Sequence, residues 1–581
     1  MRLNRPEVRR VLRRALPIAL AVLVVGAATL RAWVSDDAYL TFRTIDNFSH
    51  GLGLRWNALE RVQVYSDPLW MFLMLGLHAL TREFYFSSIA LSLALSAAAV
   101  GIVGFRLTRT TEQATLAVAM LLVSRAFLDY STSGLENPLT HLLLGLLLWC
   151  GLEDNRATSG DVLKVTLIAA LLGTTRLDLL LLVAPLVAWR TASRPIRSAW
   201  GAVAAGALPL VGWEVFSLFY YGFLFPNTAY AKLATGLPRL EMIGHGLHYL
   251  LNSLRLDPPT LPIIAAGIVA AFKSRRGADR AAGLGIVLYL VYVVSVGGDF
   301  MSGRFLTAPL LVAVVLVARS TLSGTAALRL ACAGVVVFSL LPWTSPFRPA
   351  PDCLEDVEFG CVDASGIADE RGVHEGTAAL WNFPADGPWP NPGSFKQAGE
   401  IKSYWTNHTW ITNLQFLGLV DPDEFSPFLA PGPVTSSPYR PTIVRAAVGV
   451  LGYYLGPEIH IVDYVALGDP FLARIPAVRR DPLLPLSVPR LSGLSYRVGH
   501  YARRLPLGYY ETLTRGVNTI HDPDLAAWYD HLATITRAPL WDRERLMTIA
   551  RMNLGRYDRL LHDGLVREAA RRASSSKPGA P

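Results

Sequence analysis

Residues 15–37 read ALPIALAVLVVGAATLRAWVSDD, an apolar run that ends in two adjacent carboxylates, Asp36 and Asp37. A helix of about 20 apolar residues crosses a bilayer, so this run predicts a membrane span over 15–34. Neighbouring carboxylates repel each other and are costly close to lipid. The pair therefore marks either a solvated membrane boundary or a catalytic acid or base at the membrane surface, and both interpretations stay open at this point.

The composition is typical of a polytopic membrane protein. The 581 residues are 52% apolar and 17% charged, and the mean hydropathy is +0.33. A net charge of +9 would suit a nucleic-acid-binding protein, but most Lys and Arg lie in short loops between apolar runs. That distribution is typical of cytoplasmic loops, so no nucleic-acid partner is expected. The first apolar run lacks a small-residue cleavage site, which favours an uncleaved first membrane helix.

The apolar runs predict eleven spans, N-terminus cytoplasmic and C-terminus outside. A further run, 68–80, would make a helix only about 20 Å long, short of the ~30 Å hydrocarbon core. If it lies on the membrane, all strongly basic loops fall on one side, so an interfacial helix is expected there. The predicted spans are 15–34, 85–105, 114–129, 135–151, 162–175, 178–190, 199–220, 259–272, 281–297, 304–319 and 323–343.

This topology places five polar loops on the outer face: 35–43, 131–137, 174–178, 225–232 and 297–304. The spans themselves carry almost no charge. A channel or transporter more often has ionisable residues within its spans, near the midplane. The chemistry of this chain is therefore expected at the outer interface.

The chain changes character after the last predicted span. Residues 1–343 form the predicted membrane core, and residues 344–567, richer in Pro, Gly and charge, predict an extracytoplasmic mixed α/β domain. Residues 568–581 predict a disordered tail. In the polar stretch, Cys353 and Cys361 either form a disulfide or stay free.

Charged residues in the outer loops supply candidate chemistry. Asp36, with Asp37 assisting, is the first candidate for a base that takes a proton from a hydroxyl. The pair is also a candidate site for a divalent cation such as Mg²⁺, Mn²⁺ or Ca²⁺, although no cofactor is required. The sequence has no HExxH motif and no Cys/His cluster, so zinc is not expected.

Arg176, Lys232 and Arg304 are candidate cations for a lipid phosphate. Each has a simpler alternative: a local ion pair with Asp178, an interfacial lysine or a tight turn. Glu136 and Asp299 are candidates for binding sugar hydroxyls or orienting these cations, and Glu136 alternatively begins a helix. Aromatic residues such as Tyr65 either pack on sugar or lipid or form an interfacial belt.

Several blocks together resemble the GT-C glycosyltransferases, and within them the terminal β-(1→2)-arabinofuranosyltransferases of mycobacterial-type cell-wall synthesis. The blocks are DDAYLTFRTIDNFSHGLGLRWNALERV (36–62), TSGLE (132–136), YYGFLFPNTAYAK (220–232), GGDFMSGRFLTAPL (297–310), VDYVALGDPFLAR (462–474), RVGH (497–500) and LPLGYY (505–510). Their combined order is fairly specific, whereas no single block is. In this family the first outer loop carries the catalytic carboxylate, which corresponds to Asp36 or Asp37.

The resemblance implies a pentosyltransferase in the bacterial plasma membrane. It would move D-arabinofuranose from a polyprenyl-phosphate donor to an extracytoplasmic cell-envelope glycan or glycolipid. Two alternatives stay open: a GT-C transferase that uses another polyprenyl-linked sugar, such as a hexose, for surface polysaccharide or protein glycosylation, and a lipid or glycan transporter. The donor-site candidates are Arg43, Glu136, Arg176, Asp178, Asn227, Lys232, Asp299 and Arg304, and Asp463, Asp469 and His500 are acceptor-side or structural.

Overall fold

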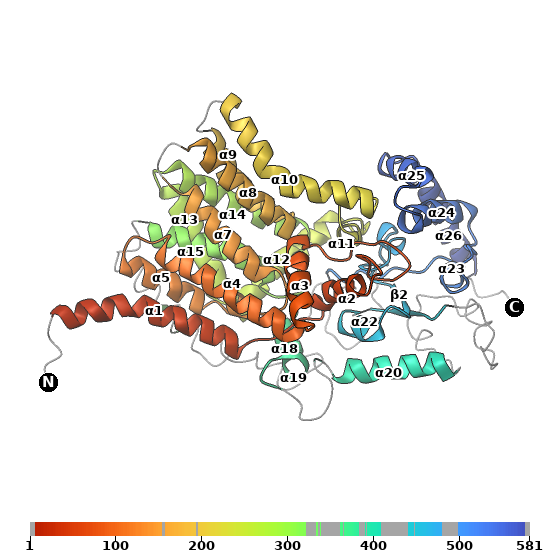
Figure 1. The fold of residues 1–581 in the computed structure, drawn as a ribbon, viewed down its shortest axis with the longest axis horizontal. Helices are drawn as coiled ribbons and strands as arrows, with labels where there is room; N and C mark the ends of the chain where they lie inside the picture. Colours follow the sequence, from red (N-terminus) through yellow and green to blue (C-terminus); the bar gives the residue numbers. More distant parts are fainter. Residues whose placement is uncertain are drawn as a thin grey trace.

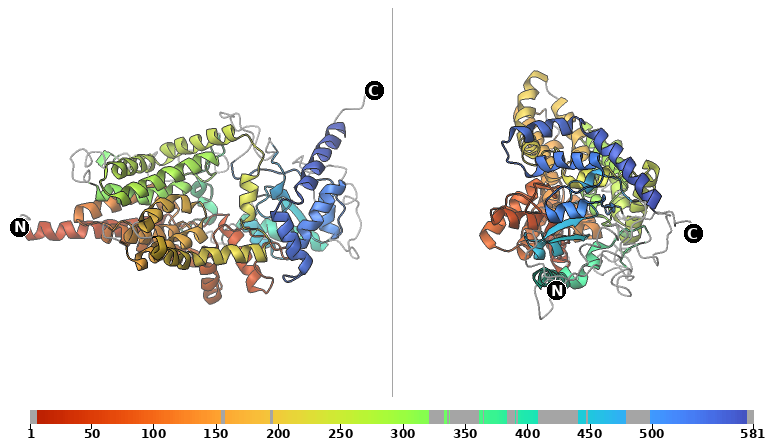
Figure 2. Two further views of the ribbon diagram at one scale, coloured as in Figure 1. Left: turned by 90° about the horizontal axis from the view of Figure 1, so that it is seen from above. Right: turned by 90° about the vertical axis from the view of Figure 1, so that its right-hand side faces the viewer.

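The computed structural model shows a long helical bundle that carries the N-terminus at its far end and a smaller C-terminal part at its other end (Figure 1). The view from above, at the left of Figure 2, shows the same division, with the C-terminal helices beyond the end of the bundle. The structure describes residues 6–153, 157–192, 196–320, 333–334, 337, 361–363, 365–382, 390, 392–407, 440–446, 448–478 and 498–575.

The bundle is built from helices that overlap the predicted spans. α4 coincides with the predicted span 85–105. The predicted span 323–343 lies largely outside the described residues. The bundle helices are α1 (Pro6–Leu30), α4 (Tyr85–Phe105), α5 (Thr111–Leu122), α7 (Asn137–Gly151), α8 (Ser159–Thr175), α9 (Leu179–Ala192), α10 (Ile196–Tyr220), α13 (Thr260–Lys273), α14 (Gly277–Ser295) and α15 (Thr307–Arg319).

The predicted span 114–129 is wrong as a single element. α5 ends at Leu122 and the short helix α6 (Arg125–Asp129) follows. Ser124 causes the break because its hydroxyl caps α6, accepting from the backbone N–H of Phe127 at 3.1 Å. Such a local bond offers the backbone an alternative to continuing the first helix.

Within the described ranges, three helices are long and apolar enough to cross a membrane: α4, residues Ala199–Tyr220 of α10, and α14. The helix α12 (Arg239–Leu256), which the sequence analysis did not assign, would form a fourth span with α13, but the two are bent by 111°. Several further apolar helices are shorter. The chain is therefore a helical protein with several apolar helices, whereas the number of eleven spans stays a prediction.

The helix α3 (Pro68–Thr81) occupies the segment predicted as interfacial. It lies crosswise at the end of the bundle that faces the C-terminal part (Figure 1), and it packs against α2 (Ala38–Ser49), α4 and α8. At 14 residues it is about 21 Å long. Its position and length agree with a helix that lies along a membrane surface, which stays a prediction.

The C-terminal part combines helices of 4 to 18 residues with one parallel pair of strands in its described residues. β1 (Thr442–Arg445) pairs with β2 (His460–Asp463), with Thr442 opposite His460, and α22 (Val450–Leu455) connects them. An α/β domain over the whole of 344–567 stays a prediction, because much of that range is not described. The other helices are α18 (Glu370–Val373), α19 (Glu375–Ala378), α20 (Pro392–Asn407), α23 (Tyr509–Arg515), α24 (Pro523–Arg537), α25 (Arg543–Asn553) and α26 (Asp558–Ser575).

Two predictions for the C-terminal region can be compared with the structure. The predicted tail from residue 568 begins too early, since α26 continues to Ser575. The cause is a tertiary contact: Glu568 accepts a hydrogen bond from the backbone of Leu507 at 2.9 Å and from Arg572 at 2.8 Å. Cys361 is disulfide-bonded, and because Cys353 lies outside the described residues, their pairing stays a prediction.

The segment between α1 and α3, which includes α2, joins the two parts. Its residues Leu40, Trp56 and Val62 belong to the same buried apolar cluster as Val444 and Ile461 of the strands. From the other side, Arg545 donates to the carbonyls of Phe219 at 2.8 Å and Tyr220 at 2.9 Å, at the end of α10. The C-terminal part is therefore fixed to the end of the bundle by apolar and polar contacts.

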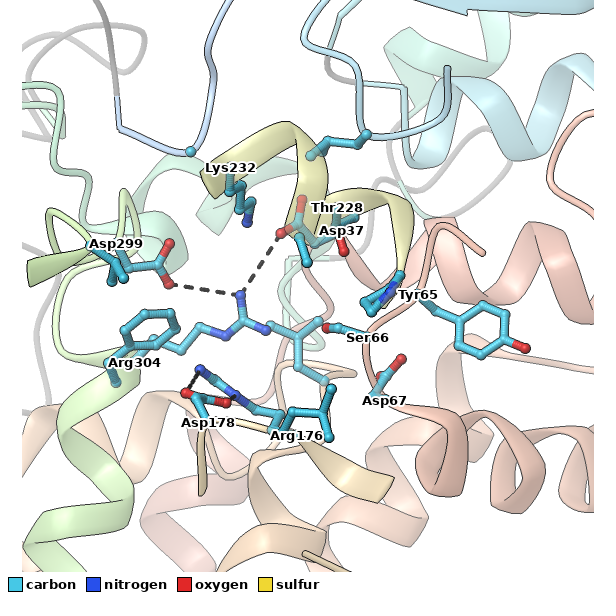
Figure 3. Close-up of a pocket in the computed structure, with 18 of the residues that line it drawn as sticks. Asp37, Tyr65, Ser66, Asp67, Arg176, Asp178, Thr228, Lys232, Asp299 and Arg304 are labelled. Atoms are coloured by element: carbon cyan, nitrogen blue, oxygen red, sulfur yellow. Dashed lines mark hydrogen bonds and ion pairs between the residues drawn. The ribbon is translucent and has the colours of Figure 1, made fainter. Parts of the chain in front are cut away.

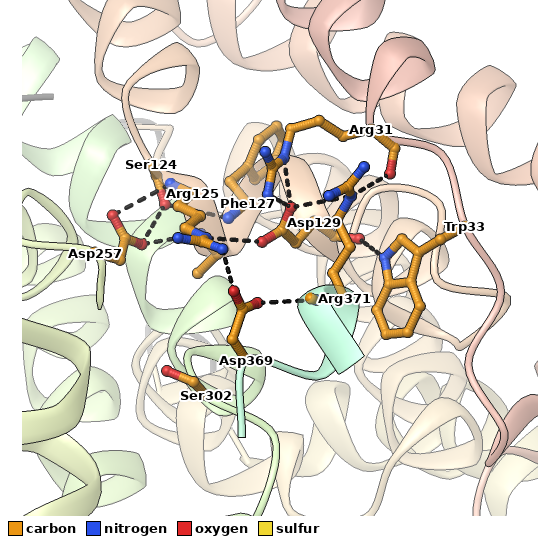
Figure 4. A network of polar contacts seen from close by, with 12 residues as sticks. Arg31, Trp33, Ser124, Arg125, Phe127, Asp129, Asp257, Ser302, Asp369 and Arg371 are labelled. Atoms are coloured by element: carbon orange, nitrogen blue, oxygen red, sulfur yellow. Dashed lines mark hydrogen bonds and ion pairs between the residues drawn. The ribbon is translucent and has the colours of Figure 1, made fainter. Parts of the chain in front are cut away.

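A buried charge network makes a second junction (Figure 4). Asp129 at the end of α6 contacts Arg31 at 2.6 Å and Arg125 at 3.4 Å, and Arg125 also pairs with Asp369. The side chains of all four are at most 7% exposed. Removing one member would leave an uncompensated buried charge, so the network holds the segment around residue 369 in one position.

Candidate active site

A cavity of about 210 Å³ lies where the bundle meets the C-terminal part. Figure 3 shows charged side chains of both signs around it. Each predicted outer loop contributes to its wall, as do residues from the C-terminal part. Seven of the predicted site residues line it: Asp37, Glu136, Arg176, Asp178, Lys232, Asp299 and Arg304.

Glu136 lies between two arginines at the floor of the cavity. It immediately precedes α7, and it accepts from Arg176 at 3.3 Å and from Arg304 at 3.3 Å. Arg176, just after α8, also makes a two-pronged contact with Asp178 at 3.0 and 2.6 Å. A guanidinium and a carboxylate have matching planar geometry, so this cluster holds both arginines in fixed orientations.

Arg304 faces three carboxylates. Besides Glu136, its Nη1 lies 3.9 Å from Oδ2 of Asp37 and 3.8 Å from Oδ2 of Asp299. The loop that carries it needs glycine: Gly298 has φ +76°, and a Cβ there would lie 2.5 Å from Cβ of Tyr249. Through these contacts Arg304 connects Glu136 to Asp37, the carboxylate that precedes α2.

Asp37 precedes α2 and reaches the cavity with 23% of its side chain exposed. Burial raises the pKa of Asp37 to about 6, although Lys232 and Arg304 act in the opposite direction. A carboxylate with such a pKa is largely ionised at neutral pH and still accepts a proton readily, which are the requirements for a general base.

Lys232 lies in the last turn of α11 (Asn227–Leu233). Its ammonium is 5.9 Å from the ring centroid of Phe300. In the part of the chain that the structure describes, it has neither a hydrogen-bond nor an ion-pair partner. It is therefore the cavity cation best placed to receive an incoming anion.

Asp67 is a cavity residue that the sequence analysis missed. It immediately precedes Pro68 of α3 and accepts from the hydroxyl of Thr41 at 3.4 Å. Burial, and then the nearby Glu136 carboxylate, raise the pKa of Asp67 well above its usual value. The one sequence signal was the motif Ser-Asp-Pro before an apolar helix, which marks a helix start equally well.

Three of the predicted catalytic and donor-site residues do not line the cavity. Asp36 accepts from the backbone N–H groups of Gly449 at 3.0 Å and Val450 at 2.8 Å, and so anchors α22. Arg43 is buried over the ring of Trp56 and donates to two backbone carbonyls of the C-terminal part. The Asn227 amide likewise donates to three backbone carbonyls between residues 466 and 469. The prediction of donor contacts for Arg43 and Asn227 is therefore not supported by their positions.

The residues predicted as acceptor-side or structural have structural contacts. Asp463 accepts from the backbone of Val465 and Gly468, and Asp469 accepts from Tyr509 at 2.8 Å. His500 packs edge-on to Phe300, with ring centroids 4.3 Å apart. Only the neighbours of these residues, such as Leu467 and Gly499, line the cavity.

The two carboxylates of the candidate cation site, Asp36 and Asp37, have different neighbours. The Asp36 carboxylate is engaged by backbone N–H groups of the C-terminal part, whereas Asp37 faces Arg304. Among the described residues, no group of three His, Cys, Asp or Glu side chains is placed to hold a metal ion. The use of a divalent cation at Asp36 and Asp37 stays a prediction.

Fold and site together define a helical protein with apolar, membrane-type helices and a charged cavity at the end of its bundle. No protein-family model matches the chain. It is 30% identical over 338 residues to the terminal β-(1→2)-arabinofuranosyltransferase of Mycobacterium tuberculosis, covering 50% of this chain and 53% of that protein. It is 29% identical over 352 residues to the enzyme of that name from Corynebacterium glutamicum, covering 50% and 49%.

The resemblance inferred from the sequence is confirmed by these relatives. The chain spans about half the length of the curated relatives it matches. Among solved structures, ArnT from Cupriavidus metallidurans bound to undecaprenyl phosphate gives a TM-score of 0.39 at 14% identity, over 52% of this chain and 59% of that one. The Archaeoglobus fulgidus oligosaccharyltransferase gives a TM-score of 0.42 at 12% identity, over 79% and 65%.

Proposed function

We propose that this chain is a membrane glycosyltransferase of the GT-C type, and that the cavity is its active site. The donor is a polyprenyl-phosphate sugar, D-arabinofuranose in the first instance, and the acceptor is a hydroxyl of a cell-envelope glycan or glycolipid. One observation carries the proposal: Asp37, with its raised pKa, faces Arg304 and Lys232 in a single cavity. A base thus lies beside cations suited to a phosphate leaving group.

In the proposed reaction, Asp37 takes the proton of the acceptor hydroxyl as its oxygen attacks the anomeric carbon of the sugar. The new C–O bond forms while the bond between the anomeric carbon and the phosphate oxygen breaks. The polyprenyl phosphate departs with the bonding electron pair, and Asp37 later releases its proton to water. Asp37 is preferred to Asp36 because the Asp36 carboxylate is already engaged by two backbone N–H groups.

The departing phosphate needs cations that are in place before the reaction. Lys232 is the first candidate, because in the described part of the chain it has no competing carboxylate in contact. Arg304 supports it from the floor, where Glu136 and Asp299 hold its guanidinium. Arg176 acts by fixing Glu136.

The proposed topology places the cavity at the extracytoplasmic surface of a bacterial plasma membrane, with a cytoplasmic N-terminus. The basic loops support it, because their residues lie at the ends of the helices remote from the cavity: Arg106 follows α4 and Arg319 ends α15. Two alternatives remain proposals of lower rank: a GT-C transferase for another polyprenyl-linked sugar, such as a hexose, and a transporter.

The test uses the full chain, purified in detergent or reconstituted in vesicles, with polyprenyl-phospho-arabinose and a short acceptor glycan. Mass spectrometry should show a pentose added to the acceptor by the wild type. Asp37→Asn should abolish the product. The matched control is Asp46→Asn on the same helix α2, outside the cavity, and it should retain the activity.

If a hexose donor reacts and the pentose donor does not, the assignment of arabinose is wrong. The assignment as a glycosyltransferase then still holds. If no donor in a panel reacts and unmodified lipid crosses the vesicle membrane, the transporter is favoured. Full activity of Asp37→Asn would overturn the proposed mechanism.

A further inference from the structure

A second cavity, of about 330 Å³, lies at the opposite end of the bundle from the candidate active site. Two helices run from one site to the other. α7 begins next to Glu136 and ends at Gly151, and α15 begins just after Arg304 and ends at Arg319. The 15 residues of α7 span about 22 Å.

The lining of this second cavity is strongly basic. Among the lining residues that the structure describes, three are arginines, Arg106, Arg109 and Arg319, and one is a carboxylate, Glu153. They come from the loop after α4 and from the end of α15, so segments far apart in the sequence build one site. Such a group of positive charges attracts an anion.

The geometry of the lining is held in place. Arg319 donates to the backbone carbonyls of Leu107 at 3.3 Å and Leu152 at 3.2 Å. The guanidinium carbon of Arg106 lies 5.3 Å from the ring centroid of Trp149, a cation–π arrangement. Trp149 itself is 40% exposed, as expected of an aromatic side chain at a membrane interface.

We propose that this cavity binds the phosphate of an anionic phospholipid head group at the interface remote from the active site. Planar guanidinium groups match the oxygens of a phosphate ester. Basic pockets between membrane helices on the cytoplasmic side are suited to anionic lipid heads. The exposed ring of Trp149 adds apolar surface beside the charges, as the glycerol and upper acyl region of a lipid requires. The proposal does not depend on the sugar-transfer activity.

Lipid binding to the delipidated full chain in detergent tests this assignment, with native mass spectrometry to count bound lipids and thermal unfolding to measure stabilisation. The probes are phosphatidylglycerol, zwitterionic phosphatidylcholine and inorganic phosphate at equal concentration. Each arginine near an anionic surface contributes about a fivefold change in affinity, so Arg106→Gln with Arg109→Gln should weaken phosphatidylglycerol binding about 30-fold. The single variant Arg109→Gln, at an exposed position, should weaken it about fivefold and guards against misfolding of the double variant.

The matched control is Arg275→Gln, an exposed arginine in the loop between α13 and α14 that does not line the cavity. It should bind phosphatidylglycerol as the wild type does. Equal binding by Arg109→Gln and the wild type would overturn the proposal, as would equal binding of phosphatidylcholine. If inorganic phosphate alone reproduces the full stabilisation, the cavity is a free-phosphate site and the lipid assignment is wrong.

Discussion

Replacing Asp37 by Asn should make the protein more stable while abolishing its proposed activity. The carboxylate lies in a cavity where burial raises its pKa to about 6, even though Lys232 and Arg304 favour its charged form. At pH 7.5 the folded protein therefore holds an ionised group that would be more stable in the unfolded chain. Asn has nearly the same shape and carries no charge, so it removes this cost.

The magnitude follows from the rise in pKa. One pKa unit corresponds to about 1.4 kcal/mol, so a rise from 3.8 to about 6 destabilises the folded state by about 3 kcal/mol once Asp37 is fully ionised. The folded-state pKa lies above the unfolded one, so the cost is absent below pH 3.8, grows as the pH rises, and is complete above pH 6. The gain of Asp37→Asn should follow the same course.

The assay is the unfolding midpoint of wild type, Asp37→Asn and the control Asp46→Asn at a series of pH values from 4.5 to 8. The gap between Asp37→Asn and wild type should be widest at pH 8 and narrow steadily toward pH 4.5. Wild-type sugar transfer should rise with pH through a midpoint near 6, since the base acts in its ionised form.

Two results would refute this reasoning. A lower midpoint for Asp37→Asn than for wild type at pH 8 would show that the charge of Asp37 stabilises the fold through its cations. A gap that does not change with pH would show that the stability difference has another origin than ionisation.

Three further substitutions separate the roles of the charged residues. Lys232→Met should lower kcat/KM at least about 100-fold by removing a cation from the leaving phosphate, with little change in unfolding midpoint; a wild-type rate would contradict that role. Asp36→Ala should cost about 1–3 kcal/mol of stability, because two buried N–H groups at the start of α22 lose their acceptor, and limited proteolysis should detect the loosened C-terminal part; unchanged protease resistance would count against the anchor. Arg125→Met should destabilise by about 3–5 kcal/mol, because Asp129 and Asp369 lose a buried partner, and an unchanged thermal midpoint would show that the network is dispensable.

The sequence was sufficient to predict which loops carry the candidate site. Glu136, Arg176, Lys232 and Arg304 lie up to 168 residues apart, yet charge placement and the assumption of one outer face brought them together. Hydropathy locates most of the long apolar helices, and the polar residues just beyond their ends share a surface. For this reason the loops that line a cavity at one end of a helical bundle can be predicted from the sequence.

The different positions of the Asp36 and Asp37 side chains were not predictable from the sequence. Adjacent residues at the start of a helix point in different directions, so Asp37 reaches the cavity while Asp36 contacts α22. The buried position of Arg43 depends on which side of α2 meets the C-terminal part. Pairs such as Arg125 and Asp369, 244 residues apart, leave no periodic signal, because long-range contacts arise only from the tertiary fold.

The contribution of the C-terminal part to the cavity wall has a consequence for how the protein is assembled. Val498 and Tyr501 of the C-terminal part line the cavity. Arg503 of the same part holds the helix that carries Lys232, because it donates to the carbonyl of Ala231 at 2.7 Å. A chain cut after the bundle would keep the charged cluster of Glu136, Arg176 and Arg304. It would lose the contacts that hold Lys232 beside that cluster. We expect each fragment alone to lack the proposed sugar-transfer activity and the reassociated fragments to recover it. Fragment complementation would therefore measure the contact between the two parts.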